Sequence, residues 1–257
     1  MQLSVIIPCR NEATILPILL DSLAAQTLVP DEIIVVDSAS TDTTRDVARA
    51  YTKTLSSLKV VSTKTPGLAF ARNFGASHAS GDMLFFVDAD VQLPSNFLQR
   101  AIKTIRARHL QAGGFTQRMP SRKLSLRFGA HVMNGYLRTM QHTPWPIAFS
   151  CLFATRTVFD KLSGFDTKIY IMEDYDFMLR ARRSSFKVGV ANVPFLASDR
   201  RYVNASSSLF FRGIYAELYR YTHGLRITKP IFEYEMGGKN QHTADDRPRP
   251  YSRDRDA

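Results

Sequence analysis

Residues 81–94 constrain the fold of this chain more than any other stretch, because an apolar run there ends in two carboxylates. Met83–Val87 is apolar throughout, and the glycine before it and the proline after it limit it to the length of a buried strand. Asp88 and Asp90 follow at the carboxyl end of this strand, where open α/β sheets place their ligands. Because side chains alternate along a strand, we expect Asp88, Asp90 and Gln92 to present oxygen atoms on one side.

Oxygen atoms arranged in this way suit a hard cation. Mg²⁺ and Mn²⁺ are often held by one or two carboxylates together with substrate phosphates. The pattern therefore predicts a Mg²⁺ or Mn²⁺ site formed by Asp88, Asp90 and Gln92. The alternative is an aspartate turn that only closes the strand, because Asp-x-Asp is common without a metal.

Strands and helices alternate around residues 81–94, which indicates a mostly parallel sheet flanked by helices, in one large α/β domain or two small ones. Strands are predicted over 3–8, 32–37, 58–62, 83–87, 111–116, 147–155 and 186–192. Three helices are predicted over 68–78, 123–140 and 206–222. Of four others only one end is predicted: one begins near Thr14, one ends near Tyr51, one follows a cap at Ser95, and one begins at Glu173. Residues 237–257 have almost no apolar side chain, which predicts a disordered tail.

The formal net charge of +11 indicates an anionic partner, and nucleotide phosphates, a phospholipid surface and nucleic acid all qualify. A basic surface that serves only solubility is the alternative. Cys9 and Cys151 show neither metal-site spacing nor a disulfide framework, which is typical of a reducing compartment. We expect no signal peptide, since Met1 leads directly into a strand, and no membrane span, since no apolar run is long enough.

A second acidic cluster, Glu173, Asp174 and Asp176, opens a predicted helix far downstream. Exposed N–H groups and the macrodipole favour carboxylates at a helix N-terminus, so capping is the alternative explanation. Three carboxylates in four positions exceed what a cap needs. The chain therefore has two acidic sites that are well separated in sequence.

Six motifs occur in an order that resembles family 2 of the inverting glycosyltransferases, whose catalytic domain has the GT-A fold. They are Val5-Ile6-Ile7-Pro8-x-Arg10-Asn11-Glu12, Val36-Asp37-Ser38-x-Ser40-Thr41-Asp42-x-Thr44, Ala71-Arg72-Asn73-x-Gly75, Asp88-Ala89-Asp90, Gly164-Phe165-Asp166 and Glu173-Asp174-x-Asp176-x-x-x-Arg180. The resemblance covers roughly residues 1–200. It implies a central sheet with a Rossmann-like nucleotide-binding half. We expect a single domain over 1–236, with a nucleotide-sugar-binding half at 1–117 and an acceptor-side half at 118–236.

The resemblance also implies roles for the motif residues. In such enzymes a UDP- or GDP-linked sugar is the donor, and its nucleoside would be held here by Pro8, Arg10, Glu12 and Asp37, with Arg72 contacting the nucleotide region. Asp88 and Asp90 would hold the Mn²⁺ or Mg²⁺ that bridges the diphosphate, Asp90 most directly. Gln92 would join them, because the segment is similar to the metal segment of dolichol-phosphate mannose synthases. Asp174, together with Glu173, would supply the catalytic base.

Sugar transfer of this kind needs both acidic sites. Charge develops on the diphosphate leaving group, and a divalent cation stabilises that charge as a Lewis acid. Inversion needs a carboxylate on the opposite face, which takes the proton of the acceptor hydroxyl. The resemblance implies a lipid-linked or cell-envelope glycan as acceptor, and a cytoplasmic enzyme that is peripheral at the inner face of the cell membrane.

Three further features concern the site: one departs from the family pattern, and two are candidate contacts outside the six motifs. Ser38-Ala39 occupies the place where Asp-Gly is frequent. His223 is a candidate for a further metal ligand, and a helix C-terminal cap is the alternative. Asp199-Arg200-Arg201 is a candidate diphosphate contact, and a solvated basic turn is the alternative.

Three other classes of protein share part of the pattern. A nucleotidyltransferase should show a glycine-rich phosphate loop after the first strand, and Arg10-Asn11-Glu12 contains no glycine. A dinucleotide oxidoreductase is excluded, because no G-x-G-x-x-G follows any strand. A non-catalytic basic module for RNA or anionic lipid would leave Asp37 and both acidic clusters without a purpose, so we expect no nucleic-acid partner.

The predicted helices at 123–140 and 206–222 place Arg and Lys beside apolar stripes. This composition is typical of helices that lie on an anionic membrane surface. We expect at least the second helix to be partly exposed and to dock on anionic lipid. The alternative is that both stripes pack against the sheet, as amphipathic helices usually do.

Overall fold

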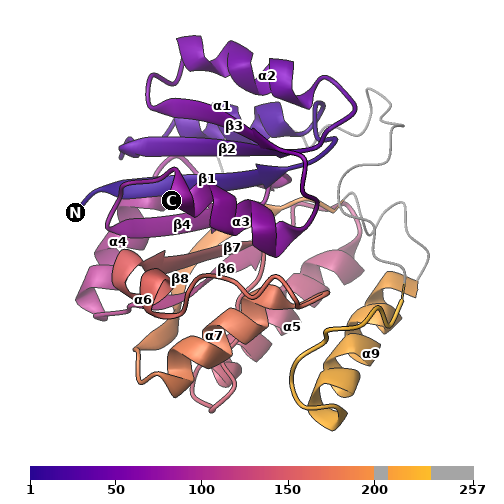
Figure 1. Cartoon of the computed structure of the whole chain (residues 1–257). Helices are drawn as coiled ribbons and strands as arrows, with labels where there is room; N and C mark the ends of the chain where they lie inside the picture. Colours follow the sequence, from indigo (N-terminus) through magenta and orange to yellow (C-terminus); the bar gives the residue numbers. More distant parts are fainter. Residues whose placement is uncertain (200–207, 233–257) are drawn as a thin grey trace.

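The computed structural model describes residues 1–199 and 208–232 (Figure 1). The tail at 237–257 and the pair Arg200 and Arg201 lie outside the described residues, so the expectations for them stay predictions. Within the described part, eight strands form one sheet in the order β3-β2-β1-β4-β7-β6-β8-β5. They are β1 (Leu3–Cys9), β2 (Glu32–Ser38), β3 (Leu58–Thr63), β4 (Met83–Val87), β5 (Val91–Gln92), β6 (Ala112–Arg118), β7 (Cys151–Thr155) and β8 (Val188–Ala197). The helices are α1 (Leu16–Ala24), α2 (Thr44–Ala50), η1 (Tyr51–Lys53), α3 (Leu68–Ser77), α4 (Phe97–Ala107), α5 (Leu124–Met140), α6 (Arg156–Lys161), α7 (Glu173–Arg183) and α9 (Ser208–Thr222).

The first half of the sheet is parallel, as the alternation of strands and helices predicts. Strand β1 pairs in parallel with β2 and β4, and β2 pairs in parallel with β3. The second half is mixed, because β7 is antiparallel to both β4 and β6, and β5 is antiparallel to β8, whereas β6 and β8 are parallel. The predicted α/β architecture with a mostly parallel sheet is confirmed, and the carboxyl ends of β1, β2 and β4 meet at one edge.

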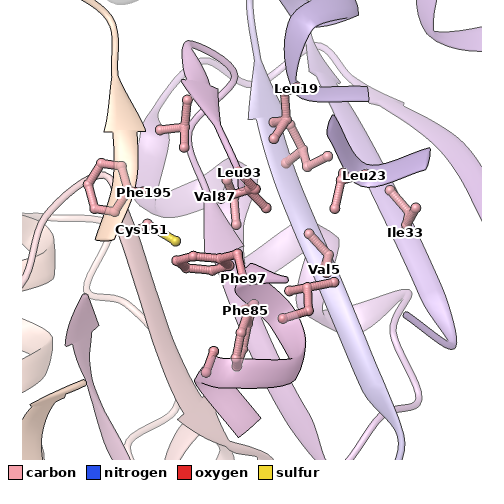
Figure 2. Packing of buried hydrophobic residues seen from close by; sticks show 14 of the residues in the cluster. Val5, Leu19, Leu23, Ile33, Phe85, Val87, Leu93, Phe97, Cys151 and Phe195 are labelled. Carbon is pink, nitrogen blue, oxygen red and sulfur yellow. The ribbon is translucent and has the colours of Figure 1, made fainter. Parts of the chain in front are cut away.

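Helices cover both faces of the sheet and enclose two apolar layers. Val5 and Phe85 face the layer beneath α1 and α4, where Phe97 is fully buried (Figure 2). The next residues along the same strands, Ile6 and Phe86, face the opposite layer, which α3, α6 and α7 complete. Strand side chains have a period of two, so consecutive apolar residues supply both layers. Full burial of one such side chain contributes about 1.5–3 kcal/mol.

Three of the predicted boundaries are wrong. Strand β8 ends at Ala197 and not at residue 192. Strand β7 begins at Cys151 and not at residue 147, because Ser150 has a left-handed backbone (φ 55) that turns the chain just before the strand. Helix α4 is not capped by Ser95, since its N-cap residue is Asn96, which makes no side-chain cap hydrogen bond. The carbonyl of Ser95 instead accepts the N–H of Thr27 at 2.8 Å.

Helices α5, α7 and α9 lie together at one end of the molecule (Figure 1). Leu137 and Met140 of α5 pack against Tyr175 of α7. The hydroxyl of Tyr136 on α5 donates a hydrogen bond to Glu217 on α9, and α5 and α9 are therefore joined directly.

Candidate active site

The predicted nucleoside-binding residues lie at the carboxyl ends of β1 and β2 and in the loop after β1. Pro8 and Asp37 belong to the ends of the two strands, and Arg10 and Glu12 belong to the loop. The register of these strands places Pro8 beside Val36 and Cys9 beside Asp37. The chain leaves β1 through Arg10, and the two loops begin at the same edge of the sheet.

Hydrogen bonds between the loops hold them together. Asn11 has a left-handed backbone (φ 54), and its side-chain Oδ1 accepts the N–H of Thr41 at 2.8 Å. The N–H of Glu12 donates to Thr44 Oγ1 at 2.8 Å, and Glu12 is 4% exposed. The structure thus brings Pro8, Arg10, Glu12 and Asp37 into one region, as the motifs predict. Whether they hold a nucleoside stays a prediction.

Asp37 is fully buried and ion-paired. Its Oδ2 accepts hydrogen bonds from Arg45 Nη2 at 2.8 Å and Nε at 3.0 Å, and its Oδ1 accepts the N–H of Ser40 at 3.2 Å. A buried carboxylate is costly unless it is paired, and Arg45 compensates its charge. Sequence reasoning missed Arg45, because the pair joins a strand end to a helix across a turn and follows no periodic spacing.

The first acidic cluster is a turn and not a continuation of the strand. Strand β4 ends at Val87, and the N–H of Val91 donates to the carbonyl of Asp88 at 3.3 Å. The N–H of Asp88 donates to the carbonyl of Ser150 at 2.8 Å, which ties this turn to the chain before β7. Gln92 belongs to the separate strand β5. Asp88, Asp90 and Gln92 therefore do not lie on one continuous strand. The strand alternation from which we expected them to share a side is wrong.

Arg72 joins the two acidic clusters. It lies on α3 with 1% of its surface exposed, and it donates from Nη2 to Asp88 Oδ1 at 3.0 Å and from Nη1 to Glu173 Oε1 at 2.6 Å. Its guanidinium also lies 5.3 Å from the centre of the Phe165 ring. Burial opposes the charge, but Asp88, Glu173 and Asp174 outweigh it and raise the pKa of Arg72. Its Nε is buried without a hydrogen-bond partner in the described structure.

Asp174 sits beside this ion-pair network in the first turn of α7, and it is 8% exposed. Burial raises the pKa of Asp174 well above its usual range, and the neighbouring Glu173 and Asp88 carboxylates add to this effect. The cation of Arg72 and the N–H of Tyr175, which donates to Asp174 Oδ1 at 2.9 Å, oppose the shift without reversing it. A carboxylate with a raised pKa is a stronger base, so the environment suits proton abstraction.

The residue after Arg72 fixes the loop before α7. Asn73 Nδ2 donates to the carbonyl of Phe165 at 2.8 Å, and the N–H of Phe165 donates back to Asn73 Oδ1 at 2.8 Å. Gly164 has φ 72, and a Cβ placed on it would lie 2.5 Å from Asn73 Oδ1. The Ala-Arg-Asn motif on α3 therefore holds both the Gly-Phe-Asp loop and the start of α7.

Asp176 belongs to a different network. Its Oδ2 accepts Arg180 Nε at 2.7 Å, and its Oδ1 accepts Arg226 Nε at 3.0 Å. Arg226 also pairs with Asp166 of the Gly-Phe-Asp loop. Sequence reasoning missed Arg226, because it follows α9 in a segment without a recognisable motif, and the short bridge between Ile171 and Ile227 brings it here.

The donor atoms of the first cluster fit a hard cation that is shared with phosphates. Asp88 keeps a side chain that is 21% exposed, and Asp90 and Gln92 are half-buried. Among residues 1–199 and 208–232, no three His, Cys, Asp or Glu residues are grouped closely enough to hold a metal. One or two carboxylates suffice for Mg²⁺ or Mn²⁺ when a substrate supplies phosphate oxygens, so the turn fits such a site only together with a diphosphate.

His223, the candidate for a further metal ligand, follows directly after α9. His223 is exposed and stacks on the ring of Tyr219, with 4.0 Å between the centroids, and its Nδ1 lies 3.2 Å from the carbonyl of Tyr219. It therefore closes the C-terminal turn of α9, as the capping alternative predicts. Cys9 and Cys151 are free and buried.

Comparison with known proteins adds independent findings. The family model described as "Glycosyl transferase family 2" matches residues 4–161. The chain is 28% identical, over 178 residues, to a PGL/p-HBAD biosynthesis glycosyltransferase of Mycobacterium bovis (strain BCG / Pasteur 1173P2), a match that covers 69% of this chain and 68% of the relative. It is 41% identical over 104 residues to a validoxylamine A glucosyltransferase of Streptomyces hygroscopicus subsp. limoneus, covering 39% of this chain and 23% of that one.

Solved structures agree with this match. The mannosyltransferase PcManGT from Pyrobaculum calidifontis, in complex with GDP-Man and Mn²⁺, superposes with a TM-score of 0.63 and 25% identity. This chain spans 56% of the length of that protein, and the match covers 76% of this chain. The S. aureus TarS fragment 1–349 in complex with UDP-GlcNAc gives a TM-score of 0.59 at 22% identity, with 77% and 58% coverage, and supports the fold.

Proposed function

Because the chain belongs to glycosyl transferase family 2, we propose that it moves a sugar, with inversion, from a UDP- or GDP-linked donor to a hydroxyl acceptor in a metal-dependent reaction. The observation that carries this proposal is the position of Arg72, whose guanidinium contacts Asp88 and Glu173 at the same time. This contact holds a turn suited to a metal–diphosphate next to a helix N-terminus that carries Asp174, whose pKa is raised. The proximity of these two groups supports a reaction in which one serves the leaving diphosphate and the other the acceptor hydroxyl.

The donor is proposed to bind across the carboxyl ends of β1, β2 and β4. Pro8, Arg10, Glu12 and Asp37 would hold the nucleoside end, and Asp88, Asp90 and Gln92 would hold Mn²⁺ or Mg²⁺. When bound, the cation supplies Lewis-acid stabilisation of the leaving diphosphate. Arg72 stands behind Asp88, where it positions this carboxylate and adds positive charge near the nucleotide.

Asp174 is proposed to act as general base. Its carboxylate takes the proton of the acceptor hydroxyl while that oxygen forms a bond to the anomeric carbon of the sugar. The bond between this carbon and the diphosphate breaks, and its electron pair leaves with the diphosphate. Glu173 is engaged by Arg72 at 2.6 Å, so we assign it the positioning of Arg72 and Asp174.

A binding screen tests the proposed donor class. Nucleotide sugars linked to UDP or GDP are added with and without Mn²⁺, and the melting temperature is measured. A ligand at a hundred times its Kd stabilises a native protein by about 2.7 kcal/mol, which corresponds to a rise of about 5–10 °C for a chain of this size. The nucleotide-sugar donor is rejected if no such sugar raises the melting temperature in Mn²⁺.

The product that is released distinguishes sugar transfer from nucleotidyl transfer. Sugar transfer releases UDP or GDP from the donor, whereas a nucleotidyltransferase forms or consumes pyrophosphate. We expect only the nucleoside diphosphate, since the loop after β1 lacks the glycines of a phosphate-binding loop.

The acceptor is proposed to be a lipid-linked or cell-envelope glycan. The M. bovis relative is named for PGL/p-HBAD biosynthesis. We further propose that this chain acts in the cytoplasm, peripheral at the inner face of the membrane, where a lipid-linked acceptor would be within reach. None of the described helices combines the length and the apolar composition that crossing a bilayer requires.

A further inference from the structure

Helix α5 has an inner face that packs and an outer face that does not. Leu137, Ala130 and Met140 are buried on the inner face, and Asn134 is held there by two hydrogen bonds to the backbone of Gln117. The interior thus uses only one side of this helix.

The outer face of α5 carries a stripe of large apolar side chains. Leu124 is 73% exposed, Phe128 is 70% exposed and Val132 is 56% exposed. Their spacing of four residues aligns them along one side of the helix. A Cβ on Gly129 or Gly135 would meet no atom of the described residues within 4 Å, so nothing in that part of the chain covers the helix beside the stripe. A surface helix normally shows polar residues on this side, and aligned exposed apolar residues indicate an interaction surface.

Positive charge is concentrated in the segment of the sequence that contains this stripe. Residues 91–159 contain ten Lys or Arg and no Asp or Glu, whereas the whole chain has 34 basic and 23 acidic residues. Almost all of the net charge of +11 therefore comes from this one segment. Lys123 and Arg127 are exposed next to Leu124 and Phe128, and Arg138 is exposed further along α5.

We propose that the outer face of α5 docks on the surface of an anionic phospholipid bilayer, with Leu124, Phe128 and Val132 inserted between head groups and Lys123 and Arg127 on the lipid charges. An interfacial helix has this arrangement, with apolar bulk on one side and basic residues along its margin. A role for this surface in reaching a lipid-linked acceptor rests on the proposed function, but the docking itself does not.

Charge and apolar area together favour a bilayer over the other partners. Nucleic acid would meet the positive charge through its phosphates but would leave the apolar stripe in contact with water. A second copy in a two-fold dimer would oppose the same basic segment to itself, and the like charges of the two copies would repel. A bilayer satisfies both parts of the surface.

The same helix is coupled to the candidate active site. Its inner residues Leu137 and Met140 pack against Tyr175, which follows the proposed base Asp174 directly. An acceptor that is anchored in the bilayer would therefore approach from the side on which α7 begins.

Co-sedimentation with vesicles tests the docking surface. The full chain is mixed with vesicles of phosphatidylglycerol and phosphatidylcholine, or of phosphatidylcholine alone, at low and at high salt. We expect binding only to the anionic vesicles, and weaker binding at high salt, because the Debye length falls from about 10 Å at 0.1 M to about 3 Å at 1 M. Absence of binding to anionic vesicles at low salt overturns the proposal.

Two double variants of α5, each with a control elsewhere on the surface, distinguish docking through α5 from non-specific electrostatic or hydrophobic binding. Lys123→Gln with Arg127→Gln should reduce partitioning about thirtyfold, since each basic residue near such a surface contributes about fivefold. Leu124→Ser with Phe128→Ser should reduce it at least about tenfold. The matched controls are Arg49→Gln with Lys53→Gln, on α2 and η1 at the opposite end of the molecule (Figure 1), and Val29→Ser, at a residue that is 70% exposed. Equal binding by the α5 variants and their controls contradicts the proposal.

Nucleotide release in vesicle-free buffer keeps the two proposals apart. All the α5 variants should release UDP or GDP at the wild-type rate, because none of the substituted residues belongs to the proposed active site. A chain that binds vesicles but never releases nucleotide would contradict the proposed function and leave the docking surface supported. Normal nucleotide release without vesicle binding would contradict the docking surface and leave the proposed function supported.

Discussion

Arg72 and Glu173, which are 101 residues apart in the chain, form a buried ion pair with 2.6 Å between Nη1 and Oε1. The same guanidinium contacts Asp88, so the two acidic clusters that look separate in the sequence form one electrostatic unit. Since α3 carries Arg72 and α7 carries Glu173, this unit also fixes how the two helices sit at the edge of the sheet.

Loss of Arg72 is predicted to affect stability as well as activity. Arg72→Met leaves the carboxylates of Asp88 and Glu173 without their buried counterion. We expect the free energy of unfolding to fall by about 3–5 kcal/mol. Urea denaturation measures it, and a double-mutant cycle with Glu173→Gln should show a coupling of about 0.5–3 kcal/mol. Additive effects of the two substitutions would show that the ion pair is not formed in solution.

Asp174→Asn is predicted to raise the stability of the protein, by an amount that depends on pH, and to lower its activity. The folded-state pKa of Asp174 is raised, so the folded protein keeps a proton that the unfolded chain loses above the ordinary carboxyl pKa. The wild type is therefore destabilised as the pH rises through this window, and the uncharged Asn is not. The melting temperature of the variant should exceed that of the wild type by a margin that grows as the pH rises above the ordinary carboxyl pKa and levels off above the raised pKa of the folded state.

The activity of the same variant should move in the other direction. Without a general base, turnover should fall by about 10²–10⁴, while donor affinity stays near the wild-type value. If Asp174→Asn lost donor binding and kept its turnover, Asp174 would be a donor contact, and Glu173 would be the next candidate for the base.

Asp90→Ala is predicted to remove the metal dependence of donor binding while the fold survives. Asp90 lies in a turn at the end of β4 and is only half-buried, so its loss removes little packing. Calorimetric titration with GDP or UDP should show tighter binding in Mn²⁺ for the wild type and no such effect for the variant. Asp160→Ala, at an exposed aspartate on α6, is the matched control and should behave as the wild type. The same Mn²⁺ effect in both variants would rule out Asp90 as a ligand.

Gly164→Ala is predicted to disturb the start of α7 from outside the site. Gly164 has φ 72, and the added Cβ would lie 2.5 Å from Asn73 Oδ1, so the variant should lose stability and turnover together. Gly129→Ala on α5 meets no neighbouring atom and should gain up to about 1 kcal/mol from helix propensity. Melting curves of the two variants test the contrast, and equal shifts would contradict it.

The sequence predicts those parts of the fold and site that depend on short-range pattern. Apolar runs indicate β1, β2 and β4 closely, and the motifs indicate the strand end that carries Asp37, the turn that carries Asp88 and the helix start that carries Asp174. Contacts between distant segments are not encoded in any local spacing. The pairing of Arg72 with Glu173 depends on how α3 and α7 pack on the same face of the sheet.

Local conformations that no pattern marks account for the other differences. Ser150 adopts a left-handed backbone and shortens β7, and the turn at Asp88 replaces a continued strand. The helix at 206–222 is expected to be partly exposed, and in its described part Tyr215 and Leu218 are exposed, as are Leu124, Phe128 and Val132 on α5. Docking of α9 on lipid stays a prediction. Periodicity detects an apolar face, but only the packing shows which side of a helix the interior uses.

The most direct test of the proposed chemistry is NMR of the first products formed from an α-linked nucleotide sugar in Mn²⁺, with water or an added alcohol as acceptor. Proton spectra report the anomer of the newly formed sugar, and phosphorus spectra report the released phosphate species. Direct displacement aided by Asp174 predicts that the β-anomer forms first, together with UDP or GDP. Initial formation of the α-anomer, or release of pyrophosphate or a nucleoside monophosphate, would contradict it.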